Sequence, residues 1–404
     1  MFYSIYLVTR QGIAAWYFQQ GSPEAIQSAI AWDSGNPRYY DALASLMHSY
    51  AANEKPGDLI RLQETAARLS PYDAYYWVDL GAAYEWTGRS AEAARAFKRA
   101  QQLFPNSPNI NWRLANFYIR DHDVTDGLRC LQKVLLGSSV PRRDVFLLAT
   151  NATRDNGEIL DETLPRHATY FFDYINFQIS MNRIDAAEQT WARLLELHLP
   201  FGFREAFPYL DALIQHQEVG PLLQAWSTLG ERFPEQIRPR ALPGDSVLNG
   251  NFEFEILNGG LDWRVTPVEG ATVSLDSEGP REGFRSLRID FDGTRNLDYY
   301  HVVQFVPLRP GTRYNLSMNV RGKGITTDSG PRFQVYDAYD MARLFLSTEN
   351  LVGNYGWTSQ NIEFNTPADT RLLVVRVARP ASRKFDSHLA GTIWISHVSL
   401  TPVK

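Results

Sequence analysis

The feature that most constrains this chain is a residue pattern that recurs every 34 residues through its first half. The clearest copy, AYYWVDLGAAYEWTGRSAEAARAFKRAQQLFPN, begins at Ala74. Its small and apolar residues fit one face of a first helix and the facing stripe of a second: Trp77, Leu80, Gly81, Tyr84, Ala93, Phe97 and Ala100. Gly88 allows the turn between the helices, and Pro105 ends the second one. Such a fixed period predicts a solenoid of stacked helix pairs.

The same spacing continues on both sides of this copy, and it resembles the tetratricopeptide repeat. The flanking copies carry Leu114, Ala115, Tyr118, Gly127 and Leu131 on one side, and Leu43, Leu46, Tyr50, Ala66 and Pro71 on the other. More distant copies are marked by Ala25, Ala29, Trp32 and Pro37, by Phe171, Asn182, Ala187 and Trp191, and by Leu222, Trp226, Leu229 and Pro234. A degenerate or shortened pair is expected at about 142–166. We therefore expect six to seven helix pairs over residues 1–236.

The resemblance implies that the first helix of each pair contributes to a surface that holds a peptide or a partner protein. The residues expected on this surface are Tyr75, Glu85, Trp86, Trp112, Asn116, Arg120, Phe172 and Asn176. Aromatic rings supply contact area at low entropy cost, and Asn and Arg supply directional hydrogen bonds. The alternative is that Trp86 and Trp112 pack between neighbouring repeats or against the second half of the chain.

The second half of the sequence changes from a helical period to an alternating one. Residues 237–246 contain prolines and a glycine without periodicity, so we expect a short, stiff linker there. Beyond it, Leu287, Ile289 and Phe291 alternate with charged residues, and further strands fit 247–254, 300–307, 314–321, 332–338, 359–365, 371–379 and 392–400. The fold class is therefore multidomain: an all-α solenoid, then an all-β two-sheet sandwich or jelly roll over 247–404.

The motifs of this half, in order LNGNFEF, GFRSLRIDF, VQFVPLRPGTRYNLSMNVRG, GWTSQNIEFNTP and GTIWISHVSL, resemble jelly-roll carbohydrate-binding modules of the family 4/9 type. The resemblance implies glycan binding by rings that stack on sugars and by polar side chains that read hydroxyl groups. The expected set is Trp263, Tyr299, Tyr300, Asn315, Asn319, Arg321, Tyr336, Asp337, Tyr339 and Trp357. The alternative for each is a core ring or an ordinary solvated residue, because this fold also serves to dock or space domains.

Relatives of this type often hold a structural calcium, and Glu253 fits the acidic position near the first strand. The last strand carries Ser396 and His397 where an aspartate is usual, so no cofactor other than this doubtful calcium is expected. The eight histidines show no paired-ligand spacing, and no phosphate-binding or dinucleotide-binding glycine motif is present. We therefore expect no enzyme; a glycan hydrolase built on the sandwich ranks third among the interpretations.

Charge and hydropathy restrict the partners. There are 23 basic and 27 acidic residues before Asp245, and 17 and 18 from there onward. Neither half is basic, which argues against nucleic acid or an anionic membrane as the partner.

The first 18 residues are apolar but interrupted by Arg10 and Gln11, so they are expected to form a first helix and not a membrane span. That helix is rich in large apolar residues: Phe2, Tyr3, Ile5, Tyr6, Leu7, Val8, Trp16, Tyr17 and Phe18. We expect this end to be covered by a missing membrane anchor or by another copy.

These observations predict a non-enzymatic binding or scaffold protein of the bacterial cell envelope or the extracellular space. In this interpretation the solenoid binds protein partners and the sandwich binds glycan, with a role in assembly or export of a surface polysaccharide. The alternative is a self-assembling structural protein, a filament or lattice subunit in which both halves contact other copies.

Overall fold

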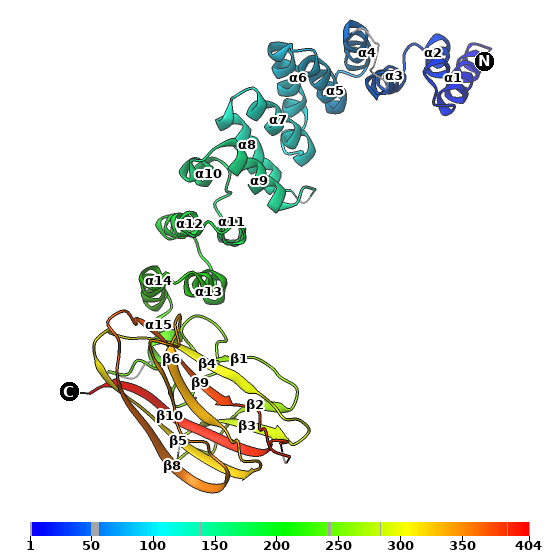
Figure 1. Cartoon of the computed structure of the whole chain (residues 1–404). Helices are drawn as coiled ribbons and strands as arrows, with labels where there is room; N and C mark the ends of the chain where they lie inside the picture. Colours follow the sequence, from blue (N-terminus) through cyan, green and yellow to red (C-terminus); the bar gives the residue numbers. More distant parts are fainter. Residues whose placement is uncertain are drawn as a thin grey trace. The chain divides into compact units, whose positions relative to one another are not determined.

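The computed structural model describes residues 2–49, 56–137, 139–240, 244–282, 284–385 and 387–403. The chain divides into two compact units, one made of Met1–Phe177 and Gln189–Pro200, the other of Gln178–Glu188 and Phe201–Lys404. The first unit is built of helix pairs, and the second joins the last helices to a β-sandwich (Figure 1). Among the described residues, no helix combines the length and hydropathy needed to cross a bilayer.

The described part of the helical region contains seven consecutive helix pairs followed by short helices. The pairs are α1 (Phe2–Gln19) and α2 (Pro23–Trp32), α3 (Pro37–Ser49) and α4 (Pro56–Leu69), α5 (Ala74–Trp86) and α6 (Ser90–Leu103), α7 (Pro108–Arg120) and α8 (Val124–Leu135), α9 (Arg142–Ala152) and α10 (Asn156–Glu162), α11 (Ala168–Ser180) and α12 (Ile184–Glu196), and α13 (Phe207–Gln215) and α14 (Val219–Arg232). The short elements are η1 (Phe203–Ala206), α15 (Pro234–Ile237) and η2 (Arg238–Arg240). As expected, the pair at 142–166 is short, because α10 has only seven residues.

The repeat beginning at Ala74 shows why these residues form a tight pair. Asp73 caps α5 by accepting a hydrogen bond from the backbone N–H of Tyr75. Gly88 has a φ of 74°, a conformation that glycine adopts without strain, and it turns the chain into α6. Where the helices cross, Gly81 faces the buried ring of Phe97 so closely that an added Cβ would lie 2.8 Å from Phe97 Cδ1. The missing side chain therefore sets the distance between α5 and α6.

The β-sandwich consists of two five-stranded antiparallel sheets. One has the strand order β1-β4-β9-β6-β7 and the other the order β2-β3-β10-β5-β8. The strands are β1 (Arg264–Val265), β2 (Ala271–Asp276), β3 (Ser286–Asp292), β4 (Tyr299–Pro307), β5 (Arg313–Ile325), β6 (Arg332–Asp337), β7 (Phe345–Ser347), β8 (Gly353–Asn365), β9 (Leu372–Arg379) and β10 (Ala390–Pro402). Their alternate apolar residues, such as Val302, Leu316 and Val375, meet in one core between the sheets.

The strand expected at 247–254 is not formed, and this prediction was wrong. Asn249 and Phe252 have φ angles of 50° and 54°, which break the extended backbone. The segment is instead an irregular stretch that buries Val247 and Phe252 in the core. The side chain of Gln304 holds it there by bonding both the N–H and the carbonyl of Leu248.

The last helices of the second unit lie directly against its sandwich. An added Cβ at Gly259 would meet the ring of Phe207 in α13, and one at Gly260 would meet the ring of Trp226 in α14. The guanidinium of Arg240, at the start of the segment expected as a linker, pairs with the buried carboxylate of Asp262 at 3.0 Å. Close ring-to-glycine contacts and a buried ion pair therefore connect helix pair and sandwich within this unit.

Candidate functional site

A pocket of about 460 Å³ lies among α3, α4, α5 and α7 of the first unit. Three of the residues expected on the protein-binding surface line it: Glu85, Trp86 and Arg120. The Arg120 guanidinium pairs with the Glu85 carboxylate at 2.8 Å, and the Trp86 side chain is about half exposed. The Trp86 ring meets the His48 ring edge-on, with centroids 5.3 Å apart. Trp86 therefore contacts the neighbouring repeat and still presents part of its ring to the pocket.

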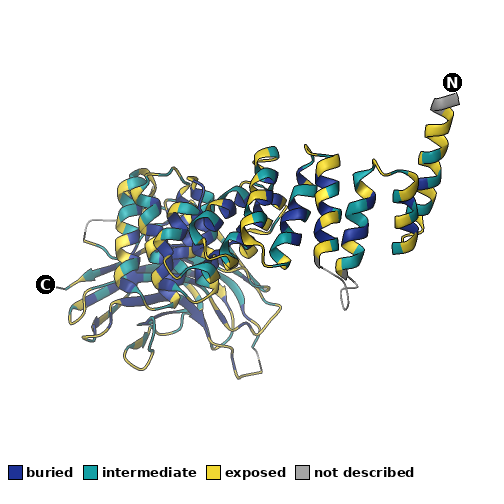
Figure 2. Ribbon diagram, turned by 90° about the horizontal axis from the view of Figure 1, so that it is seen from above, coloured by how far each residue is buried: buried dark blue, intermediate teal, exposed yellow. Residues whose placement is uncertain are grey.

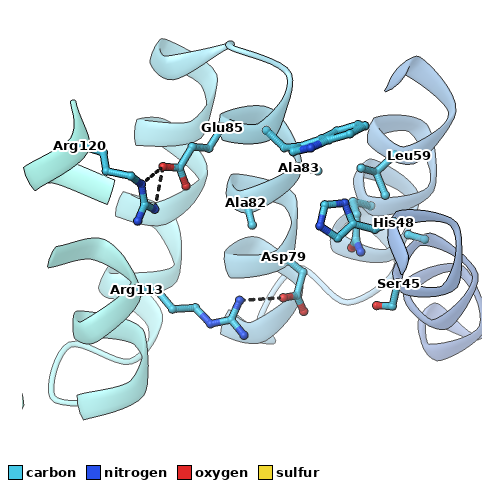
Figure 3. Close-up of a pocket in the computed structure, with 12 residues that line it drawn as sticks. Ser45, His48, Leu59, Asp79, Ala82, Ala83, Glu85, Arg113 and Arg120 are labelled. Atoms are coloured by element: carbon cyan, nitrogen blue, oxygen red, sulfur yellow. Dashed lines mark hydrogen bonds and ion pairs between the residues drawn. The ribbon is translucent and has the colours of Figure 1, made fainter. Parts of the chain in front are cut away.

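The lining of the pocket is more polar than the sequence indicated. Asp79 of α5 lies 3.5 Å from the Arg113 guanidinium of α7 (Figure 3). Gln63 of α4 also lines the pocket and donates a hydrogen bond from Nε2 to Asp41 Oδ1 at 3.0 Å. The remaining lining residues are Ala44, Ser45, His48, Leu59, Ala82 and Ala83. The pocket thus combines apolar walls with a small group of hydrogen-bonding side chains.

Asp79 is the most perturbed acid of this pocket. Burial raises the pKa of its carboxyl to about 6; the Asp41 carboxylate adds to the increase, and the Arg113 guanidinium opposes it. The carboxyl is therefore partly protonated in the range of pH 5 to 7. A cation placed beside it would favour the ionised form and lower this pKa.

The other expected protein-binding residues have different surroundings. Tyr75 and Trp112 line a second, smaller pocket of about 280 Å³ between α5 and α7, and Asn116 Nδ2 donates to the Trp112 carbonyl. Asn176 is exposed on α11. Phe172 is buried, with its ring 6.3 Å from that of Trp191 in α12. Phe172 therefore packs between helices, and its prediction as a surface residue was wrong.

Four residues of this pocket were not predicted from the sequence: His48, Gln63, Asp79 and Arg113. A signal existed for Asp79, because Tyr75, Asp79 and Trp86 are spaced by four and seven residues and so share one helix face. No comparable signal existed for Gln63, which comes from the second helix of the preceding repeat. Its place in the pocket depends on how that repeat stacks on α5.

Three of the residues expected to bind glycan are interior instead, and a fourth, Tyr339, is half-buried. Trp263 and Tyr299 are only 1% and 0% exposed and belong to the sandwich core, so no sugar can stack on them in this fold. Asp337 is buried and accepts hydrogen bonds from the Thr370 hydroxyl and from the backbone N–H groups of Tyr339 and Asp340. The Tyr339 hydroxyl is buried, and burial raises its pKa to about 12. The prediction of Trp263, Tyr299 and Asp337 as ligand contacts was wrong, because the fold buries all three side chains.

Two of the expected rings lie together on the outer face of the β1-β4-β9-β6-β7 sheet. The Arg376 guanidinium of β9 lies over the Tyr336 ring of β6 at 4.7 Å and over the Tyr300 ring of β4 at 5.7 Å. The Tyr336 ring is 6.3 Å from that of Phe345 on β7, and the Tyr300 ring stacks on His301 at 5.0 Å. We call these five residues, Phe345, Tyr336, Arg376, Tyr300 and His301, the aromatic row. They cross four neighbouring strands.

The geometry of the aromatic row is held by its central arginine. Arg376 Nε donates to Gln334 Oε1 at 2.8 Å, and Nη1 donates to the Tyr336 hydroxyl at 3.3 Å. Gln334 pairs with Arg376 in the register of β6 and β9, so the interaction is fixed by the sheet. Burial raises the pKa of the Tyr336 hydroxyl, with Arg376 opposing the shift, so this tyrosine is neutral at physiological pH. Tyr300 and Phe345 stay substantially exposed at the two sides.

The remaining expected residues belong to the other sheet. Asn315, Asn319 and Arg321 alternate along β5 with the buried residues of the core, and Trp357 lies on the neighbouring β8. Arg321 pairs with Glu278 at 2.6 Å and lies over the ring of Trp394 at 4.7 Å. The structure therefore does not bring the ten predicted residues into one site, because they divide between the core and two opposite faces.

The surroundings of Glu253 do not fit a calcium ion. Its neighbours are the amide of Asn251, which also contacts the His397 ring, and the Arg285 guanidinium, which donates to the Glu253 carbonyl. The positive charge of the Arg285 guanidinium, next to Glu253, opposes the binding of a calcium ion there. Across the described ranges, no group of three or more His, Cys, Asp or Glu residues is arranged to hold a metal.

Comparison with known proteins finds one family match and several partial structural likenesses. Residues 74–107 match the family model of the tetratricopeptide repeat. Similar solved structures include the MamA protein (15% identity, TM-score 0.33, covering 43% of this chain and 92% of that one) and a structure described as "CBM4 structure and function" (16%, 0.29, 39% and 100%). Another is the enzymatically active domain of bacteriophage CBA120 tailspike protein 4 (16%, 0.29), where the match covers 40% of this chain and 22% of that one.

No curated protein matches the sequence. The chain spans only about a fifth of the tailspike chain. At these identities and TM-scores, the structural likenesses carry no information on ligand or partner. The chain therefore consists of helical pairs, one of which matches the tetratricopeptide repeat at residues 74–107, followed by a two-sheet β-sandwich.

Proposed function

We propose that this chain is a non-enzymatic binding or scaffold protein of the bacterial cell envelope or extracellular space. Its helical repeats bind protein partners through the first helices, and its sandwich binds a glycan. A protein that joins the two classes of ligand fits a role in the assembly or export of a surface polysaccharide. The repeat match and the polar, partly aromatic pocket among α3, α4, α5 and α7 support the protein-binding half.

The observation that carries the glycan-binding half is the aromatic row. Tyr300 and Phe345 are about half exposed, so part of each ring is open to the C–H groups of a pyranose. Between them, the Arg376 guanidinium lies against the rings of Tyr300 and Tyr336. The guanidinium has donors beyond those used by Gln334 and Tyr336, and these suit sugar hydroxyls or carboxylates. The sheet holds these groups in place before a ligand arrives, which limits the entropy lost on binding.

A polysaccharide array tests this half of the proposal. The full chain, fluorescently labelled at its amino groups, should bind at least one family of neutral or acidic polysaccharides, and excess soluble polysaccharide of the same kind should compete. A chain that binds no polysaccharide on a broad array of bacterial and plant glycans would contradict the glycan-binding role. It would favour a structural role for the sandwich.

A second function, self-assembly into a filament or lattice, is favoured by one observation in the first helix. Ile5, Val8 and Trp16 of α1 are 55%, 69% and 60% exposed, and the helix next to the N label in Figure 2 is largely uncovered. Such large exposed apolar groups are typical of a contact surface. The side chains of Phe2 and Tyr3, expected in the same surface, lie outside the described residues.

Light scattering coupled to size-exclusion chromatography separates the two functions. If α1 is a contact between copies, the mass of the wild-type chain should rise with concentration, and Val8→Ser with Trp16→Ser should return it to that of a monomer. Tyr72→Ser, which changes an even more exposed aromatic of the repeats, is the control and should leave the mass unchanged. A wild-type chain that stays monomeric up to high concentration would remove support for self-assembly.

A further inference from the structure

The pocket among α3, α4, α5 and α7 contains a buried hydrogen-bond acceptor without a partner. Gln63 is 3% exposed, and within the described residues its Oε1 has no hydrogen-bond partner. The orientation of this amide is fixed by chemistry, because the Asp41 carboxylate can only accept, so Nε2 must face it. The oxygen is therefore directed elsewhere, and Gln63 lines the pocket.

An unsatisfied buried acceptor is unfavourable unless a water or a ligand supplies a donor. Leaving such a group unpaired costs free energy, whereas a donor that enters the pocket recovers the lost hydrogen bond. Asp79 lines the same pocket, and its only ion pair within the described residues is the relatively long 3.5 Å contact to Arg113. Two acceptors of the same pocket therefore have capacity for additional N–H donors.

The charges around the pocket also leave room for one cation. Three carboxylates line it or bond directly to a lining residue, namely Asp41, Asp79 and Glu85. Two guanidiniums, Arg113 and Arg120, oppose them, and Arg120 is already engaged with Glu85. With each carboxylate counted as −1 and each guanidinium as +1, this set has a net charge of −1. The complement of such a site is a single positive charge.

The apolar part of the pocket suits the stem of a long basic side chain. Ala44, Leu59, Ala82 and Ala83 form walls without polar groups, and the half-exposed ring of Trp86 offers a face for a cation or its methylene groups. Lysine and arginine each join an aliphatic stem to a charged head, so they meet both requirements together.

We propose that this pocket accepts a basic side chain, lysine or arginine, of a protein partner. The head group donates to Gln63 Oε1 and pairs with the Asp79 carboxylate, and the stem lies along Trp86 and the alanines. The inference rests on the proposed protein-binding role of the repeats and names the chemistry that the partner presents there.

Small amino-acid amides test this directly on the full chain. Nα-acetyl-lysine methylamide and its arginine counterpart are titrated by NMR, with the norleucine and citrulline amides as uncharged analogues of similar shape. The readouts are the indole N–H signal of Trp86 and the side-chain amide signals of Gln63. We expect saturable shifts with the two cationic probes and at least fivefold weaker binding of the neutral ones. Equal binding of charged and neutral probes would overturn the proposal.

Two variants locate the interaction. Asp79→Asn keeps the shape of the side chain but removes its charge, and Gln63→Met removes the acceptor; each should weaken the cationic probe at least fivefold. Asp126→Asn, which removes a carboxylate from α8 outside this pocket, should leave the affinity unchanged. Cationic probes that bind both variants as tightly as the wild type would contradict the assignment. A melting curve for each variant checks that the fold persists.

The pH dependence supplies a readout that unfolding would not imitate. Asp79 faces Asp41 from α3 and Arg113 from α7, with Asp73 at the N-terminus of its own helix, and His48 and Glu85 also border the pocket. A bound cation should lower the Asp79 pKa from about 6, so probe affinity should fall as the pH decreases from 7 to 5. A chain that binds polysaccharide but shows no preference for cationic probes would refute the pocket proposal alone.

Discussion

The contact between Gly81 and Phe97 gives a sharp test of the repeat packing. Gly81→Ala adds a Cβ 2.8 to 3.0 Å from three atoms of the Phe97 ring, well inside the ordinary contact distance of about 3.5 Å. The ring is 2% exposed and enclosed by the repeat, so it can move only by displacing its neighbours. Overpacking of this kind costs about 1–3 kcal/mol. Alanine also gains roughly 1 kcal/mol over glycine in a helix interior, which offsets part of the loss.

Gly12→Ala is the matched control for this change. Gly12 lies inside α1, and an added Cβ there would meet no atom within 4 Å. This variant therefore receives the helix-propensity gain without the clash and should be stabilised by up to about 1 kcal/mol. We expect local stability to differ between the two variants by about 1–3 kcal/mol, each measured against the wild type in its own helix.

Hydrogen exchange read by mass spectrometry is the appropriate assay, because a chain of several cooperative units does not unfold in two states. Protection of the α5 and α6 amides should decrease in Gly81→Ala, whereas the α1 amides should become more protected in Gly12→Ala. The β3 and β10 amides serve as an internal reference in both. If Gly81→Ala protects α5 and α6 as well as the wild type or better, the reasoning about this helix crossing is wrong.

Two further predictions follow from buried groups. Burial raises the Asp79 pKa above its unfolded value, so this carboxyl destabilises the fold progressively as the pH rises from about 4 to 6. Asp79→Asn should therefore raise the melting temperature of the repeats at pH 7.5, by the equivalent of about 1 kcal/mol after allowance for solvent screening. At pH 3.5 the same variant should leave the melting temperature unchanged. Stabilisation that is the same at both pH values would contradict the shift. Gly260→Ala should destabilise the second unit by about 2–4 kcal/mol in urea denaturation, because φ is 59° and the added Cβ would lie 2.3 Å from Trp226 Cζ3. Gly311→Ala, with φ of 65° and open space around it, isolates the backbone term and should cost no more than about 1–2 kcal/mol; equal losses in the two variants would show that α14 does not pack on Gly260.

The helical repeats could be predicted because each copy carries its own small and large residues at fixed spacing. Gly81, Ala93 and Phe97 are local in sequence, and their packing repeats with the period. The pocket was less accessible, because Gln63 and Asp79 belong to different repeats and meet only through stacking. Glu85, Trp86 and Arg120 could be predicted from their positions on the first helices of their own repeats, without knowing that Gln63 of the preceding repeat lies beside them.

In the sandwich, the alternation of apolar and polar residues predicted the positions of the strands better than it predicted which side chains are exposed. Tyr299 and Tyr300 are adjacent, so ordinary alternation places one in the core and the other on the surface, and both could not line one site. The register between β4 and β9 also shifts between Tyr299 and Val302. Such an irregularity changes which residues face outward, and sequence periodicity does not reveal it. The glycine pair at 259–260 was a usable signal for close approach by rings, but nothing local identified those rings as Phe207 and Trp226.

The most direct test of the central claim, that the aromatic row is a glycan-binding surface, is affinity electrophoresis of the full chain in gels containing a polysaccharide that it binds. Tyr336→Ala should lose retardation at least tenfold, and Tyr300→Ala should lose a comparable part, because both rings flank Arg376. Tyr72→Ala, an exposed tyrosine of the repeats, should migrate as the wild type does. Undiminished retardation of Tyr336→Ala, together with loss in Trp357→Ala on the opposite sheet, would contradict the account and assign the glycan to the other face.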